Sequence, residues 1–96
     1  MIMHVVMWKF KEGEDANAET FLKGLEALKD IIPQIVEMEV GKNVNPKNDF
    51  DAALVIKFRN LNDLEIYKNH PEHLKLSALC KGIRTDRQAV DFEIDG

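Results

Sequence analysis

The chain has 96 residues, so we expect one domain that spans residues 1–96. Apolar residues make up 45% and charged residues 31% of the sequence, which is the balance of an ordinary globular protein. The 13 lysines and arginines are outnumbered by 17 aspartates and glutamates, and this net charge of −4 argues against nucleic acid as a partner.

Cysteine usage and hydropathy exclude further classes. Cys80 is the single cysteine, so no internal disulfide can form, and its apolar surroundings predict a buried thiol. No segment reaches the roughly 20 apolar residues that cross a membrane, and the first residues lack a basic leader and a cleavage site. We therefore expect a cytoplasmic protein with no membrane partner.

Residues 2–11 are predicted to form the first strand, with apolar side chains on both faces. A polar turn follows, in which Asp15 or Asn17 can cap a helix that Pro33 ends. The apolar stripe of this helix consists of Phe21, Leu22, Leu25, Leu28 and Ile32.

Residues 35–40 and 50–59 alternate as strands, and the turn-forming residues 41–49 between them indicate a hairpin with a long loop. The inner face of the second of these strands is predicted to consist of Phe50, Ala52, Leu54, Ile56 and Phe58.

A short helix is predicted from about Asp63, with Asn62 and Glu65 as a capping box and Leu61 and Ile66 as a hydrophobic staple. Pro71 ends this helix and suits the first turn of another. The apolar side of the second helix is predicted to contain Leu74, Ala78, Leu79 and Cys80.

The end of that second helix and the last strand complete the pattern. Gly82 is a candidate C-terminal cap with Ile83 beyond it, and residues 87–94 form the last strand. We interpret Lys81, Arg84 and Arg87 as solvated cations matched to the helix dipole.

The predicted element order is β-α-β-β-α-β, which is the ferredoxin-like α+β fold. Its two helices can cover one face of a four-stranded sheet but not both, yet the first strand is apolar on both faces. We therefore predict a homodimer in which two sheets pack face to face with the helices outside.

Residues 67–73 contain the only tyrosine and two of the three histidines. A first-turn position would keep His73 neutral, as a general base requires, and the Tyr67 hydroxyl can bind a carbonyl or enolate oxygen. Both residues also suit simple packing or capping roles, and the break at Pro71 prevents helical spacing from showing that they meet.

The third histidine, His4, lies on an apolar strand face, where we expect it to be buried with a hydrogen-bond partner. His70, His73 and His4 do not have the spacing of a zinc site, so no metal is predicted. No glycine-rich nucleotide motif is present, and no cofactor is predicted.

These motifs resemble those of the Dabb family, the stress-responsive dimeric α/β-barrel proteins, from His4 to about Phe92. The resemblance implies a ferredoxin-like monomer that pairs through its sheet into a barrel. The matching positions are His4 with Lys9-Phe10-Lys11, Ile31-Ile32-Pro33, Gly41-Lys42-Asn43-Val44, Tyr67 with His70-Pro71-Glu72-His73, and Asp91-Phe92.

Some plant members of this family are polyketide cyclases that perform an aldol condensation without a cofactor. By this resemblance His73 is the base, Tyr67 holds the carbonyl, and His4 is the histidine of the first strand. The ligand would be small and apolar or polyketide-like, in a pocket walled by Phe21, Leu22, Leu25, Leu54 and Ile56.

Two other functions stay open. The first is a non-catalytic dimer that serves in stress response or binds a small ligand. The second is a cofactor-free monooxygenase, which rests on analogy of fold.

Overall fold

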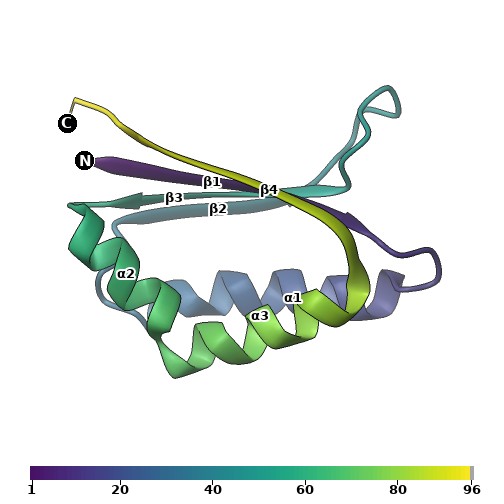
Figure 1. The fold of residues 1–96 in the computed structure, drawn as a ribbon, viewed down its shortest axis with the longest axis horizontal. Coiled ribbons are helices and arrows are strands. Elements are labelled where there is room, and N and C mark those ends of the chain that lie inside the picture. Colours follow the sequence, from purple (N-terminus) through teal and green to yellow (C-terminus); the bar gives the residue numbers. More distant parts are fainter. Residues whose placement is uncertain (96) are drawn as a thin grey trace.

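Four antiparallel strands form one sheet in the computed structural model, which describes residues 1–95. Three helices lie along one side of the sheet, as Figure 1 shows, and this arrangement confirms the predicted ferredoxin-like α+β fold. The sheet order is β2-β3-β1-β4, and the elements are β1 (Ile2–Phe10), α1 (Asp15–Ala27), a 3-10 turn (Leu28–Asp30), β2 (Glu37–Lys42), β3 (Ala52–Phe58), α2 (Leu61–Asn69), α3 (Pro71–Ile83) and β4 (Arg84–Glu93).

The core lies between the sheet and the helices. In β1 every second residue faces the helices, and the register pairs His4 with Ile56 and Val6 with Leu54 across β3. The predicted stripe of the first helix is buried against this face, because its spacing follows the helical period. The residues of that stripe are Phe21, Leu22, Leu25, Leu28 and Ile32. The predicted end of this helix at Pro33 was wrong, because α1 ends at Ala27 and Leu28–Asp30 form a 3-10 turn.

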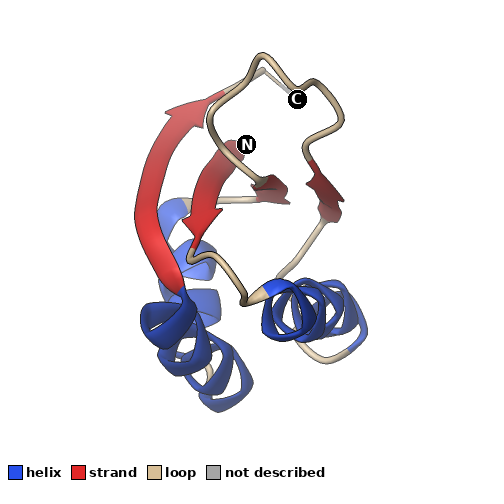
Figure 2. Cartoon of the chain, turned by 90° about the vertical axis from the view of Figure 1, so that its right-hand side faces the viewer, coloured by secondary structure: helices blue, strands red, loops and turns tan. Residues whose placement is uncertain are grey.

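The opposite face of the sheet carries no helix of residues 1–95, as the view along the sheet in Figure 2 shows. Val5 lies at its centre and is paired with Val55 of β3 and Val90 of β4. Val90 is 56% exposed and Phe92 is 46% exposed. We call this surface the open face; its members are Met3, Val5, Met7, Ala53, Val55, Lys57, Gln88, Val90 and Phe92.

The predicted helix starts were wrong. Helix α1 begins at Asp15 with Glu14 at its N-cap, and no side chain caps it. Helix α2 begins earlier than predicted because the extended Asn60 is its N-cap, and Asn60 Oδ1 accepts a hydrogen bond of 2.8 Å from the backbone N–H of Asp63. The predicted staple is also wrong, since Leu61 and Ile66 are exposed.

The predicted end of α3 was wrong as well. Gly82 does not cap this helix, which continues to Ile83 and passes directly into β4 at Arg84. Leu74 and Ala78 are exposed, because the helical period from Pro71 turns other residues toward the core. The apolar residues of α3 that pack on the core are Leu76, Leu79, Cys80 and Ile83.

The strands follow the predicted alternation with shifted ends. Strand β2 starts two residues later than predicted, and Ile35 is buried ahead of it. Strand β3 is shorter than predicted, and β4 begins three residues earlier because α3 feeds straight into it. The hairpin of β2 and β3 with its long loop is confirmed.

Candidate functional site

A cavity of about 200 Å³ lies between the sheet and the helices. Three of its lining residues are the predicted catalytic residues, His4 from β1, Tyr67 from α2 and His73 from α3. The fold therefore brings together three side chains that come from three separate elements.

Tyr67 and His73 are neighbours across the junction of α2 and α3. Their ring centroids lie 4.5 Å apart with an angle of 47° between the planes. His70 is extended, with φ −64° and ψ 135°, because the residue before a proline avoids the helical region. This break reorients the chain, so that the end of α2 and the first turn of α3 converge on one point.

His73 is held in one tautomer. Its Nδ1 lies 2.9 Å from the carbonyl oxygen of Lys68, which can only accept a hydrogen bond, so Nδ1 carries the proton. Burial lowers the pKa of His73 below its ordinary value of 6.5 more than this hydrogen bond raises it. At neutral pH the imidazole is therefore uncharged, and Nε2 is the nitrogen that can accept a proton.

His70, the first histidine of the motif, has a different task. It is the N-cap of α3, where its Nδ1 accepts a hydrogen bond of 3.1 Å from the backbone N–H of Glu72. It is not among the residues that line the cavity. The two histidines of the motif thus divide into a helix cap and a cavity residue.

His4 is buried, with 3% of its surface exposed, and its predicted hydrogen-bond partner is confirmed. Nδ1 of His4 lies 2.5 Å from Oδ1 of Asp91, which is directly opposite it on β4. Burial lowers the pKa of His4, and the Asp91 carboxylate opposes this shift. Asp91 was not predicted as this partner, and the signal that could have found it is the pairing register of β1 and β4.

Tyr67 is 1% exposed and packs between aromatic neighbours. Its ring centroid lies 5.3 Å from that of Phe58 and 6.1 Å from that of His4. Burial raises the pKa of the Tyr67 phenol well above its ordinary value, so the hydroxyl stays protonated at neutral pH. It can therefore donate a hydrogen bond to a ligand oxygen.

The cavity wall agrees with the expected residues in part. Phe21, Leu25 and Leu54 line the cavity, while Leu22 and Ile56 are buried in the core and do not line it. Other lining residues were not predicted. They include Trp8, whose ring packs edge-on against that of Phe21 with 5.1 Å between the ring centroids. The others are Val6, Ser77 and Cys80, and the Cys80 thiol is buried as predicted.

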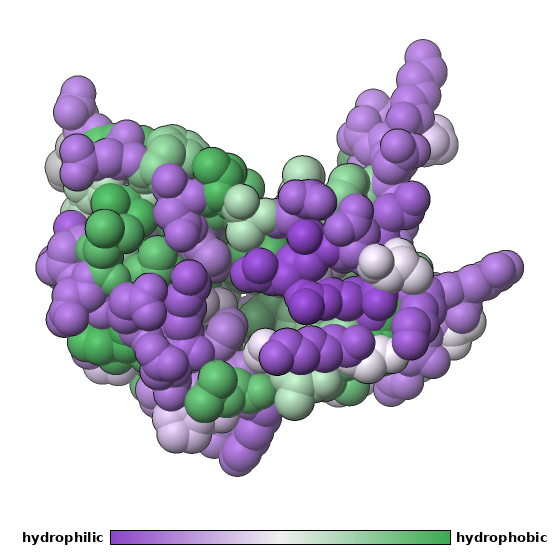
Figure 3. All heavy atoms as spheres, viewed as in Figure 1, coloured by the Kyte–Doolittle hydropathy of each residue, from purple (hydrophilic) through white to green (hydrophobic). Residues whose placement is uncertain are grey.

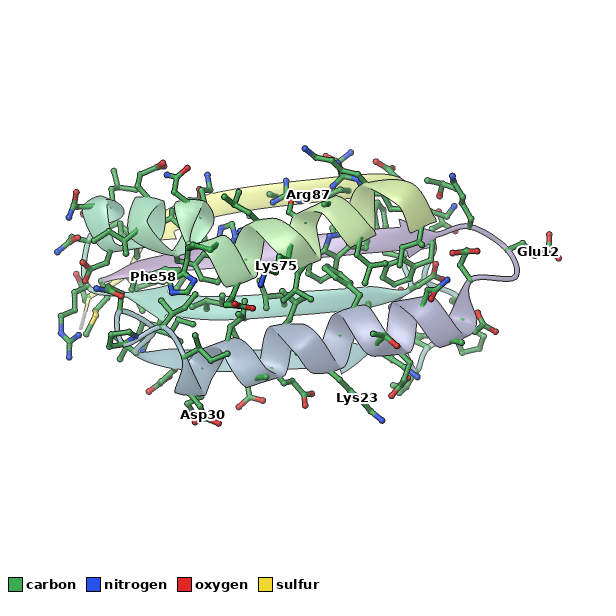
Figure 4. The ribbon with its side chains drawn as sticks, turned by 90° about the horizontal axis from the view of Figure 1, so that it is seen from below. Glu12, Lys23, Asp30, Phe58, Lys75 and Arg87 are labelled. Carbon is green, nitrogen blue, oxygen red and sulfur yellow. The ribbon has the colours of Figure 1, made fainter. Side chains whose placement is uncertain are left out.

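Three cations also line the cavity, namely Lys81, Arg84 and Arg87. The interpretation of all three as a solvated helix end was wrong, because Arg84 and Arg87 belong to β4. Figure 4 shows Arg87 at the edge of the sheet beside α3.

Within residues 1–95, no three His, Cys, Asp or Glu side chains are grouped so that they could hold a metal ion. No helix there has the length and apolarity to span a membrane.

The family model of the stress-responsive A/B barrel domain, Dabb, matches residues 2–94. The chain belongs to the Dabb family. A stress-response A/B barrel domain-containing protein of Arabidopsis thaliana is 24% identical over 96% of this chain, which spans about half the length of that relative, or 46%.

Solved structures share this Dabb fold. A protein of unknown function from Bacteroides fragilis, described as dimeric and ferredoxin-like, is 31% identical with a TM-score of 0.90, and the match covers 97% of this chain and 95% of the other. A hydroxynitrile lyase from Passiflora edulis is 16% identical with a TM-score of 0.86, over 98% of this chain and 93% of the other. The second likeness is one of fold alone.

Proposed function

We propose that this Dabb protein is a homodimer that performs acid–base chemistry of the aldol type on a small carbonyl compound without a cofactor. The observation that carries the proposal is that His73 and Tyr67 share one cavity, with the imidazole neutral and the phenol protonated. A base and a hydrogen-bond donor side by side are what proton abstraction next to a carbonyl requires.

In the proposed reaction Nε2 of His73 removes a proton from the carbon next to the carbonyl group. The Tyr67 hydroxyl donates a hydrogen bond to the oxygen on which negative charge develops. The enolate carbon then attacks a second carbonyl of the same molecule, and the His73 imidazolium returns the proton to the new alkoxide. All atoms of the substrate are retained, so the step needs no co-reactant.

His4 supplies a second histidine beside this pair. Its Nδ1 donates to the Asp91 carboxylate, which leaves Nε2 of the neutral ring as an acceptor. Its ring lies edge-on to that of Tyr67. We therefore propose that His4 holds the phenol in position and offers a second nitrogen that can accept the proton.

The size of the cavity restricts the substrate. Pockets for drug-sized ligands have volumes of about 300–1,000 Å³, and an engineered cavity of about 150 Å³ holds benzene. A cavity of about 200 Å³ therefore suits one ring or a short chain and excludes a long polyketide.

The homodimer is supported by the open face. Its central valines and the exposed Val90 and Phe92 form an apolar surface that one chain leaves without a helix. The similar Bacteroides fragilis protein is described as dimeric. We propose that the open faces of two chains pack together, as two such sheets do in a dimeric α/β barrel.

The reaction can be tested by deuterium exchange. Benzoylpropionate and its methyl ester are incubated with the protein in D₂O, and loss of the C–H signal next to the ketone is followed by NMR. We expect His73→Asn to slow exchange by about 10²–10⁴-fold and Tyr67→Phe by about 10²-fold. The matched control is His70→Asn, which changes the other histidine of the motif and keeps a capping side chain.

Two outcomes contradict the proposal. Exchange at the buffer rate with both compounds favours the non-catalytic ligand-binding dimer, and equal effects of His73→Asn and His70→Asn remove His73 as the base. Oxygen consumption with a phenolic substrate would favour the monooxygenase instead.

A further inference from the structure

The charge of the cavity is opposite to that of the protein. The whole chain has a net charge of −4, yet the cavity lining contains Lys81, Arg84 and Arg87 and no aspartate or glutamate. Figure 3 shows strongly hydrophilic side chains gathered between β4 and α3, the two elements that carry these residues. The cations are thus concentrated at one side of the cavity.

These cations are not neutralised by the described part of the chain. The ion pairs within residues 1–95 join other lysines and His4 to carboxylates, and none includes Lys81, Arg84 or Arg87. Three unpaired cations beside an apolar wall attract an anion, because the low-dielectric wall strengthens their field.

The cations and the catalytic pair occupy opposite ends of the cavity. Lys81 follows His73 by two turns of α3, which corresponds to about 12 Å along the helix axis. On the sheet, Arg87 is paired with Trp8 and Asp91 with His4, so these positions are about 13 Å apart along β4. Along both elements the cations are therefore separated from the catalytic residues by a similar distance.

The middle of the cavity is apolar. Val6, which lies between His4 and Trp8 on β1, lines it, and Trp8 at the cation end packs edge-on against Phe21, which also lines the cavity. A volume of about 200 Å³ has room for one ring or a few carbons between the two ends. Burial is the main cause of the lowered pKa of His73 and His4, and the charge of Arg87 adds a smaller contribution in the same direction.

We propose that the cavity selects a small diketo acid, with the carbonyl that is enolised at Tyr67 and His73 and its carboxylate at Arg87, supported by Arg84 and Lys81. This inference rests on the proposed function, since it names the class of substrate for the same site. A guanidinium group binds both oxygens of a carboxylate, which fixes the orientation of the ligand as well as its charge.

The test uses benzoylpropionate, a ketone with a ring and a carboxylate, and its uncharged methyl ester. Trp8 is the only tryptophan, so its indole N–H signal reports binding in the cavity. We expect the acid to bind about tenfold more tightly than the ester. Arg87→Gln should abolish this preference, while Arg59→Gln, which removes an exposed arginine outside the cavity, should leave it unchanged.

Equal binding of the acid and the ester overturns the assignment, and so does an Arg87→Gln variant that behaves like Arg59→Gln. Deuterium exchange of the ester that depends on His73 would then leave the proposed chemistry intact. Selective binding of the acid without any exchange would overturn the proposed chemistry and leave recognition of the carboxylate.

The affinity of the acid should also fall with rising salt, because Arg87 is exposed.

Discussion

A charge at the centre of the open face should separate the proposed homodimer. Val5 is the residue to change, because it lies on β1 between Val55 and Val90, in the middle of the apolar surface. In one chain the Val5→Asp carboxylate would face water, so the fold should survive. In a face-to-face dimer the same carboxylate would be buried without a cation opposite it in the sheet.

The size of the effect follows from symmetry. An unpaired buried charge costs several kcal/mol, and we take about 3 kcal/mol for each protomer. A twofold interface contains the substitution twice, which gives about 6 kcal/mol and weakens the dimer by about 10⁴-fold.

Sedimentation velocity at micromolar concentration measures this directly. Wild-type protein should sediment as a pair of 11.0 kDa chains, and Val5→Asp as single folded chains. Leu61→Asp is the matched control, since Leu61 is 60% exposed in the first turn of α2, where an acidic residue is tolerated. A folded wild-type monomer, or a Val5→Asp variant that remains as dimeric as Leu61→Asp, would refute the proposed packing.

Two further predictions concern stability. Because burial lowers the pKa of His4 and His73, both side chains bind protons more readily in the unfolded chain, so the free energy of unfolding should fall as the pH decreases below 6.5. Urea titrations at pH 7.5 and 5.5, about one unit on either side of that value, measure this change. A higher free energy of unfolding at the lower pH would contradict the prediction. A Cβ added at Gly24 of α1 would lie 2.5 Å from Leu76 Cδ2 of α3, so the end of the half-buried Leu76 side chain must shift, and Gly24→Ala should stabilise the protein by less than the roughly 1 kcal/mol that helix propensity alone gives. In a Leu76→Ala background the same change should stabilise by the full amount, and equal effects in both backgrounds would rule out the clash.

The local signals of the sequence were sufficient for the fold. Apolar side chains at period 2 or period 3.6 indicate which residues face a core, and they gave the element order and the buried residues from Phe21 to Ile32 correctly. Helix starts were less accurate, because Asn60, Asn62 and Asp63 all suit a cap and packing selects among them.

The sequence by itself determined the β-α-β-β-α-β order, the two apolar faces of β1 and the helix break at Pro71, because each depends on neighbours a few residues apart. Tertiary structure decided the site. The partner of His4 is Asp91, 87 positions along the chain, and only the strand register joins them. In the same way, the fold placed Arg87 at a cavity, which no local pattern could indicate, because contacts across a sheet are set by the packing of the whole chain.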